Sequence, residues 1–332
     1  MWTQFYCNRK TKPKLTFILA FTFSLSFILS SCERSEDKGM YTGYNFEFTL
    51  EGVTSNVYVS HDPELKEFPL VLFLHGAGCG TIEHIHPASR RYLKDAGAGV
   101  LTIDKPGAYY GTKQIISLIH CSKKYYSLNY PSKRAEHLLN SIEKLNGKVP
   151  GWNGQLYIVS AHEGVIAASL IATKLNAKGL AVLGTGEGFS ESNSFKDLTL
   201  CLKEKRTACN DFQGSEEVLK ASISKDTNNR INYRGIRGTG AWWNEMLSSK
   251  TSENLKEFKG QVLIIHAGRD TTIDIKSAEL LNKNLLNAGL KGVTYKPYPE
   301  LDGGFMDPSE DNQKHKIQLE ISNWIRNQTN KI

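Results

Sequence analysis

Residues 156–164 read LYIVSAHEG, and the organisation of the whole chain can be followed outward from this stretch. Leu156–Val159 is a short apolar run, as expected of a strand that is buried on both faces of a parallel sheet. Small residues follow in the turn, and the next segment, Val165–Leu175, has the pattern of an amphipathic helix. The stretch therefore predicts a strand that enters a sharp turn and continues into a helix.

The alternation of strand and helix extends in both directions along the chain. Two β-rich segments, Tyr44–Leu50 and Val53–Val59, predict an antiparallel opening pair. Alternating βα units follow, and they predict a doubly wound, mostly parallel α/β sheet with helices on both faces. The further strands are expected at Phe68–Leu74, Gly99–Ile103, Gly179–Leu183 and Val262–Ile265, and the further helices at Ser132–Leu145, Ile275–Asn287 and Glu310–Asn327.

One segment, from about residue 185 to residue 249, interrupts the alternation. It is rich in Ser, Asn, Lys and Gly, and it contains two cysteines and the pair Trp242-Trp243. A structureless loop of this length is uncommon in a compact domain, so we predict helices within it and interpret it as a lid over the carboxyl edge of the sheet. Residues 44–332 would then form one domain with a lid insertion.

Length and charge exclude several classes of protein. A chain of 332 residues with 40% hydrophobic and 23% charged residues is neither disordered nor a small disulfide knot. Lys and Arg outnumber Asp and Glu by 41 to 34, but four of the cations lie in the first 31 residues, which leaves 37 cations against 34 acids. Because so small a surplus offers no footprint for nucleic acid, we expect no nucleic-acid partner.

The amino terminus has the layout of a secretory signal. Four cations precede the apolar stretch Leu15–Leu29, which is shorter than the roughly 20 residues that a membrane-spanning helix needs. The sequence Leu29-Ser30-Ser31-Cys32 resembles the bacterial lipobox, in which cleavage before the cysteine leaves it carrying acyl chains. The resemblance implies a signal peptide over residues 1–31, a lipid anchor at Cys32, a tether over residues 32–43, and an extracytoplasmic place in the bacterial cell envelope. A simple transmembrane anchor is the alternative.

Four of the six cysteines remain once Cys7 leaves with the signal and Cys32 is acylated. An even number of cysteines in an exported chain indicates disulfides, and four cysteines allow three pairings. We favour Cys79–Cys121, which would pin two loops together, and Cys201–Cys209, which would close a short loop within one polar segment. Four buried or free thiols are the alternative.

Glycine-containing turns follow two of the predicted strands. His75-Gly76-Ala77-Gly78 comes directly after Phe68–Leu74, at the carboxyl edge of the sheet, and such a turn can direct backbone N–H groups at a developing oxyanion. Asp104-Lys105-Pro106-Gly107 follows the next strand. With the turn after Leu156–Val159, these segments make the carboxyl edge the candidate functional region.

At these residues the chain resembles the α/β-hydrolase superfamily, and the likeness extends over nearly all of its mature length. The family's elbow, Gly-x-nucleophile-x-Gly, matches Ser160-Ala161-His162-Glu163-Gly164. Leu263–Thr271 (LIIHAGRDT) resembles the strand and turn that present the catalytic acid, here Asp270. Tyr298–Phe305 (YPELDGGF) resembles the closing turn that supplies the catalytic histidine. The turns further resemble those of exported peptidase-like or esterase-like members.

Two of the three catalytic positions depart from the family pattern. The resemblance places His162 at the elbow apex, where the family has Ser, Cys or Asp, and Gly303 where the family has histidine, so that only Asp270 survives. A Ser-His-Asp relay needs both a hydroxyl and a base within hydrogen-bond reach. The resemblance therefore implies a degenerate triad, in which the backbone N–H groups of Ala77 and Glu163 remain as an oxyanion hole.

Two interpretations of His162 remain open. Its ring could lean toward Asp270, through the space that Gly303 leaves, and form a dyad that activates a water molecule. Alternatively, it fills space over an inactive site. Loss of two catalytic partners together favours the second interpretation, a pseudoenzyme.

The other candidate residues have ordinary explanations beside the functional ones. We interpret His84 and His86 as surface residues of one loop, without the ligand spacing of a zinc site, and expect no metal and no cofactor. Glu163 has the ordinary interpretation of a negative charge at the start of a helix, which interacts favourably with the helix dipole and has no further role. Asp270 could instead pair with Arg269 or cap the helix that begins near Ile275. Trp242 and Trp243 either line a ligand pocket under the lid or belong to the core.

The sequence thus predicts an exported, membrane-anchored lipoprotein of α/β-hydrolase fold that does not hydrolyse what it binds. Its expected partner is a small-molecule or peptide ligand of ester, peptide or acyl type, or a protein. An active hydrolase of ester or amide bonds, using His162 and Asp270, is the first alternative. A structural envelope protein is the second.

Overall fold

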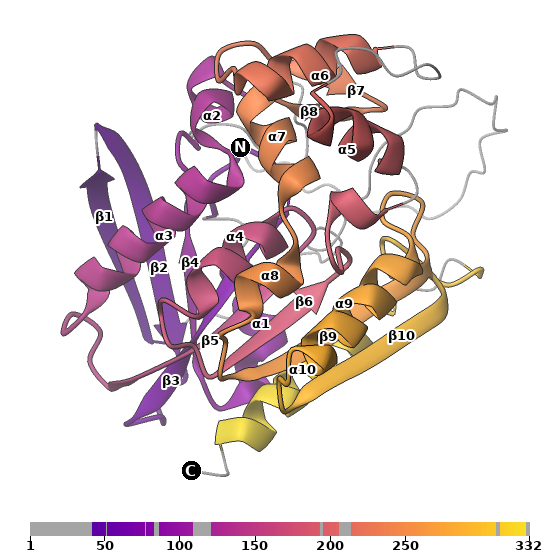
Figure 1. The fold of residues 1–332 in the computed structure, drawn as a ribbon. Coiled ribbons are helices and arrows are strands. Elements are labelled where there is room, and N and C mark those ends of the chain that lie inside the picture. The colour runs from indigo at the N-terminus through magenta and orange to yellow at the C-terminus, as the bar shows by residue number, and fades with distance from the viewer. Residues whose placement is uncertain are drawn as a thin grey trace, which may run out of the picture.

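The fold is that of a computed structural model, which describes residues 42–50, 52–76, 78–82, 86–108, 121–192, 195–205, 214–309 and 313–329 (Figure 1). Its main sheet has eight strands in the order β1-β2-β4-β3-β5-β6-β9-β10. The pairs β1·β2 and β2·β4 are antiparallel, and all later neighbours are parallel. The predicted mostly parallel sheet with an antiparallel opening pair is therefore confirmed. The strands are β1 (Thr42–Leu50), β2 (Val53–His61), β3 (Phe68–Leu74), β4 (Gly99–Ile103), β5 (Trp152–Ala161), β6 (Gly179–Leu183), β9 (Gln261–Arg269) and β10 (Val293–Asp302).

Helices cover both faces of this sheet, as Figure 1 shows. Residues of α1 (His86–Leu93), η3 (Lys94–Ala96) and α10 (Lys314–Thr329) share one core with the sheet. Residues of α3 (Pro131–Leu145), α4 (Gly164–Ala172), α8 (Thr251–Leu255) and α9 (Ile275–Asn287) share the other. Within β3, Leu70, Leu72 and Leu74 belong to the second core and Val71 to the first, because successive side chains of a strand point to opposite faces. Burial on both faces explains why these strands read as continuous apolar runs.

Strand β10 and helix α1 are among the elements that the sequence did not predict. Strand β10 runs parallel to β9 at the edge of the sheet, and most of its side chains are half-buried or exposed. It therefore lacks the apolar run that marks the inner strands. Helix α1 begins at His86, which we interpreted as a residue of a polar loop, and the side chain of His86 is buried.

The described residues of the segment 185–249 form a short 3-10 helix, three α-helices and a hairpin, and their labelled elements gather at one end of the molecule in Figure 1. The side chains of Trp242 and Trp243 are buried with Phe189, Phe195 and Tyr233 in a core of this segment, and the two indole rings meet edge to face at 5.0 Å. Their burial fits the core interpretation of this pair and not the pocket interpretation. The elements are η5 (Phe189–Glu191), α5 (Lys196–Lys203), α6 (Ser215–Ser224), β7 (Ile231–Tyr233), β8 (Ile236–Gly238) and α7 (Gly240–Ser248).

Among the described residues, no helix is both long enough and apolar enough to cross a membrane. The predicted signal peptide, the anchor Cys32 and nearly all of the tether lie outside the described part of the chain.

His86 is buried against strands β2 and β4, so its interpretation as a surface histidine is wrong. The ring nitrogen Nε2 lies 2.8 Å from the Ser60 hydroxyl, and Nδ1 lies 2.8 Å from the Thr102 hydroxyl. Burial, and to a smaller extent the charge of Arg90, lowers the pKa of His86 to about 3. His84, the other histidine of this segment, lies outside the described residues.

We expect this buried histidine to make the protein sensitive to acid. The unfolded chain takes up a proton at His86 near pH 6.5 and the folded chain only near pH 3, so the unfolded state binds more protons between these values. The free energy of unfolding therefore falls as the pH falls, by about 2 kcal/mol at pH 5 from this residue. We measure the free energy of unfolding in urea at pH 7 and at pH 5. Between these two pH values, the decrease in this free energy should be about 2 kcal/mol smaller for His86→Gln than for the wild type. An equal loss in both proteins would contradict the assignment.

Candidate active site

The elbow lies where β5 ends and α4 begins. His162 occupies its apex with φ 51°, a left-handed backbone conformation that histidine tolerates better than β-branched residues do. Two contacts with the neighbouring β6 edge fix the apex: the His162 N–H donates to the Leu183 carbonyl at 2.9 Å, and the Thr185 hydroxyl donates to the His162 carbonyl at 2.7 Å. The strand-turn-helix that the sequence predicted is therefore present, with an imidazole at its apex.

The imidazole of His162 lies between two glycine-containing turns. A Cβ atom on Gly76 would lie 3.0 Å from the His162 Cβ atom, and a Cβ atom on Gly184 would lie 3.0 Å from its Cε1 atom. Glycine at these two positions leaves the room that the ring occupies. Burial lowers the pKa of His162 below its ordinary value, although the charge of Asp270 acts to raise it. The ring is therefore a neutral imidazole at neutral pH.

Asp270 and Gly303 lie against each other, as the family resemblance implied. A Cβ atom on Gly303 would lie 2.9 Å from the Asp270 Cγ atom, so the carboxylate itself occupies the space that we expected Gly303 to leave open. Its Oδ1 atom accepts hydrogen bonds from the N–H groups of Thr272, at 2.8 Å, and Ile273, at 3.2 Å. The carboxylate thus binds backbone N–H groups and does not form the ion pair with Arg269 that was the predicted alternative.

The dyad of His162 and Asp270 is not formed in this conformation. Asp270 acts electrostatically on the ring, but among the described residues no hydrogen bond joins the two side chains. The structure therefore brings His162, Asp270 and Gly303 to one edge of the sheet, and among the described residues no hydrogen bond connects the His162 ring to Asp270.

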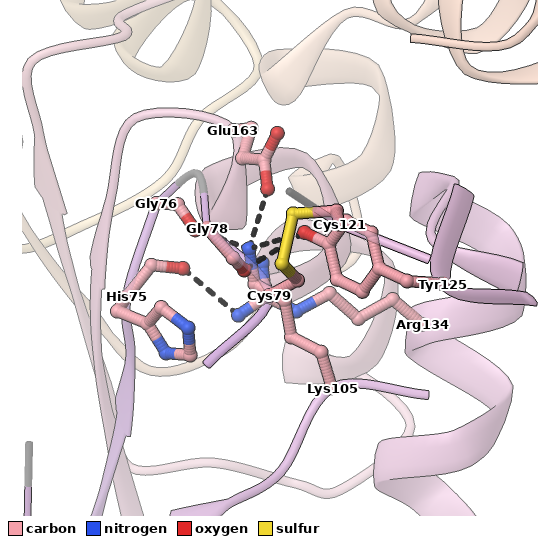
Figure 2. Close-up of polar contacts among 9 residues, drawn as sticks. All are labelled: His75, Gly76, Gly78, Cys79, Lys105, Cys121, Tyr125, Arg134 and Glu163. Atoms are coloured by element: carbon pink, nitrogen blue, oxygen red, sulfur yellow. Dashed lines mark hydrogen bonds and ion pairs between the residues drawn. A yellow bond between two sulfur atoms is a disulfide. The ribbon is translucent and has the colours of Figure 1, made fainter. Parts of the chain in front are cut away.

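Behind the turn of residues 75–78 lies a cluster of buried polar side chains (Figure 2). The Lys105 ammonium donates to the Gly76 carbonyl and to the Glu163 carboxylate, the latter at 2.6 Å. The hydroxyl of Tyr125, from α2 (Lys123–Leu128), donates to the Gly78 carbonyl at 2.8 Å. Arg134, from α3, donates to the His75 carbonyl at 2.9 Å. Three carbonyls of the turn are thus held by side chains from three different segments.

The charges of this cluster are coupled. Burial lowers the pKa of Lys105 to about 8 even though Glu163 acts to raise it. Burial would raise the pKa of Glu163, but Lys105 and Arg134 together bring it below its ordinary value. Glu163 is therefore an ionised partner in a buried ion pair, and its interpretation as a favourable charge at a helix start and nothing more is wrong.

Sequence reasoning missed most of this cluster. Lys105 lies in a turn that we singled out, but no pattern showed that its side chain reaches the elbow. Tyr125 and Arg134 stand in helices without any signal that separates them from surface residues. The predicted oxyanion donor Ala77 lies outside the described residues, and within the described part of the chain no group of three or more His, Cys, Asp or Glu side chains could hold a metal ion.

The predicted disulfide Cys79–Cys121 is present, with its Cα atoms 5.6 Å apart. Cys79 follows the turn that carries His75 and Gly78, and Cys121 precedes α2, which carries Tyr125. The bond therefore ties the turn to the helix that holds it. Cys201 is also disulfide-bonded, while its predicted partner Cys209 lies outside the described residues.

We expect loss of this disulfide to cost stability. The bond closes a loop with a sequence separation of 42 residues, and removal of such a constraint typically destabilises a protein by about 2–4 kcal/mol, mainly by freeing the unfolded chain. Urea unfolding of the double variant Cys79→Ser/Cys121→Ser, beside the wild type, measures the effect. An unchanged midpoint and slope would show that the bond contributes nothing to the free energy of unfolding.

No family model matches the sequence, and no curated protein matches it. Solved structures do match the fold. Est1E from Butyrivibrio proteoclasticus with ferulic acid bound is 14% identical, with a TM-score of 0.60 over 86% of this chain and 99% of that one. A cold-adapted esterase from an Arctic intertidal metagenomic library is 13% identical, with a TM-score of 0.53 over 88% of this chain and 96% of that one. The acylaminoacyl peptidase of Pyrococcus horikoshii is 14% identical, with a TM-score of 0.54 over 86% of this chain and 41% of that one.

These neighbours, together with the sheet order and the helices on both faces, define the class of fold. The chain has the α/β-hydrolase fold, and its structure neighbours are esterases and peptidases.

Proposed function

We propose that the protein is a non-hydrolytic binding protein, in which the elbow and the turn of residues 75–78 bind a ligand that they do not cleave. The observation that carries this proposal is the environment of His162. The side chain at the apex has no hydroxyl or thiol, and its ring is packed between Gly76 and Gly184. Among the described residues, no hydrogen bond joins this ring to Asp270, whose Oδ1 atom accepts from two backbone N–H groups instead. Without a nucleophile and without an oriented base, neither acyl transfer nor activation of water has its usual machinery.

The class of ligand follows from the fold and its neighbours. Est1E binds ferulic acid in its solved structure, and two other neighbours are an esterase and an acylaminoacyl peptidase. A small ester-, peptide- or acyl-like molecule is therefore the ligand that the inherited site would accept. A protein partner that binds at the segment of residues 185–249 is the alternative.

We further propose that the body is tethered to a bacterial membrane through acylated Cys32. The support for the tether is the signal-like amino terminus and the sequence Leu29-Ser30-Ser31-Cys32. Such an anchor would keep a binding protein at the cell envelope, outside the cytoplasm.

Hydrolysis assays test the main proposal. We expect the chain from Glu33 onward to cleave p-nitrophenyl acetate and an aminoacyl anilide no faster than free imidazole does, and His162→Ala to behave like the wild type. The imidazole reference matters because any exposed histidine slowly cleaves activated esters. Turnover well above this background that disappears in His162→Ala would overturn the proposal and support the hydrolase that uses His162.

A further inference from the structure

Both ends of the segment of residues 185–249 pass through one narrow neck. The chain leaves β6 through residues 184–188 (GTGEG) and returns through residues 249–252 at the start of α8. The outgoing and returning strands bind each other there, because the Thr251 hydroxyl donates to the Gly186 carbonyl at 2.8 Å. Whatever holds these two short stretches together therefore holds the whole segment on the body of the molecule.

The side chain of Glu187 lies at the centre of the neck and is fully buried. Its Oε1 atom accepts from the Ser252 hydroxyl at 2.5 Å and from the Asn284 side-chain amide of α9 at 3.3 Å. Its Oε2 atom accepts from the Ser252 N–H at 3.3 Å. The backbone of Glu187 makes two further bonds, from its N–H to the Ser277 carbonyl of α9 at 3.0 Å and from the Thr251 N–H to its carbonyl at 3.1 Å. One residue thus joins the outgoing strand, the returning strand and α9.

The donors to this carboxylate are neutral. Among the described residues Glu187 forms no ion pair, and the ammonium of Lys250, which acts on it from a distance, pairs with Glu191 at 2.7 Å. The other charged residues of the packed helices are exposed, namely Glu253 of α8 and Lys276, Glu279 and Lys283 of α9. Burial therefore raises the pKa of Glu187, although the hydrogen bonds and Lys250 act to lower it. The closed neck binds a proton at Glu187 more tightly than an opened neck does, so a rise in pH favours opening.

The neck also contacts the elbow. The Thr185 hydroxyl donates to the His162 carbonyl at 2.7 Å, and Gly184 lies against the His162 ring. The Ser277 hydroxyl accepts from the Glu187 N–H at 3.0 Å and donates to the Thr185 carbonyl at 3.2 Å. Hydrogen bonds therefore connect Glu187 to the apex of the elbow through Ser277 and Thr185.

We propose that Glu187 is a proton-operated clasp at the neck of the segment of residues 185–249. When protonated, it holds both ends of the segment against α8 and α9. When ionised, it releases them, because water solvates the charge better than three neutral donors do, and the contact between Thr185 and the elbow apex loosens with them. Access to the elbow then increases as the pH rises. This inference holds for a binding protein and for a hydrolase alike.

Hydrogen exchange measures the opening of the neck without any ligand. The N–H groups of Glu187, Thr251 and His162 are followed by NMR at pH 5 and pH 8 in the mature chain with Cys32→Ser, and each measured rate is divided by the intrinsic rate at the same pH. We expect the protection of all three amides to be at least about three-fold lower at pH 8 than at pH 5. Global unfolding has the opposite dependence, because buried His86 weakens the fold in acid. Protection that is equal at the two pH values, or lower at pH 5, would overturn the proposal.

Carboxylate variants identify the group that titrates. Glu187→Gln keeps the shape of the side chain without its charge and should abolish the pH dependence of protection, whereas Glu257→Gln, an exposed control just after α8, should retain it. A dependence that persists in Glu187→Gln would overturn the proposal. Ser252→Ala decides the matter if Glu187→Gln does not fold. It removes a donor to the ionised carboxylate, so the fall in protection between pH 5 and pH 8 should become larger, and an unchanged or smaller fall would overturn the proposal.

A further variant tests the connection between the clasp and the elbow. Thr185→Val removes the hydroxyl that binds the His162 carbonyl. The pH dependence of protection should remain at the Glu187 and Thr251 amides and decrease at the His162 amide. An unchanged dependence at His162 would overturn the coupling of the clasp to the elbow. Because these measurements use no substrate, their outcome is independent of the hydrolysis assays that test the proposed function.

Discussion

The double variant His162→Ser/Gly303→His should gain esterase activity, with p-nitrophenyl acetate hydrolysis rising on the order of 10²–10⁴-fold above the wild type. The reason is that two other requirements of the relay are already met. The apex already has the left-handed backbone conformation, at φ 51°, and Asp270 lies next to position 303. A serine at the apex and an imidazole at position 303 would then complete the relay of hydroxyl, base and acid.

One local adjustment limits the size of this gain. A Cβ atom at position 303 would lie 2.9 Å from the Asp270 Cγ atom, so the carboxylate has to move by a few tenths of an ångström while it keeps its bonds from Thr272 and Ile273. The single variants His162→Ser and Gly303→His should stay at the wild-type level, and Asp270→Asn added to the double variant should remove most of the gain. A folded double variant without any gain would mean that the apex and position 303 do not face each other across the site.

Glu163→Gln should destabilise the protein by about 3–5 kcal/mol at pH 7, the largest effect that we expect of any single substitution in the cluster. The substitution leaves the buried side chains of Lys105 and Arg134 without the one carboxylate that, in the described part of the chain, forms an ion pair with Lys105. Lys105→Met should cost less, because Arg134 and Glu163 then remain as one cation and one anion. Urea unfolding of the two variants measures this order.

A matched control is available on the surface. Glu216 pairs with Lys220 within α6, and both side chains are 59% exposed, so Glu216→Gln removes a carboxylate from an ion pair that solvent already screens. We expect no measurable change in its unfolding midpoint. A larger loss of unfolding free energy in Lys105→Met than in Glu163→Gln would contradict this prediction. It would mean that removal of Glu163 does not leave an uncompensated positive charge in the cluster.

The sequence alone determined the inner part of the fold. The strands β3, β4 and β6 and the helix α9 begin and end where the pattern placed them, because each inner strand is buried on both faces and the helix has one apolar side. Strand β10 and helix α1 are two of the elements that were missed. Strand β10 lies at the sheet edge, and most of its side chains are half-buried or exposed. Helix α1 packs the His86 ring inward, where the ring forms hydrogen bonds with Ser60 and Thr102.

The sequence also located the positions of the candidate site, because a strand, a sharp turn and a helix must follow one another along the chain at His162. What it could not show is how side chains distant in sequence meet there. Lys105 and Glu163 are 58 residues apart, and Arg134 and the His75 carbonyl are 59 residues apart. Likewise, only the packing of the two turns shows that the Asp270 carboxylate fills the space beside Gly303.

Local features could be predicted from the sequence and long-range contacts could not, for a physical reason. Secondary structure and the location of turns follow from local periodicity and from the residues that a turn tolerates, so a single sequence specifies them. The charge state of a buried group and the partner of a buried polar atom depend on desolvation and on distances of a few ångströms between segments that the fold brings together. For this protein the local pattern determined a mostly parallel α/β sheet with a histidine in the turn after β5, and only the tertiary structure decided that Lys105 and Glu163 pair behind that turn.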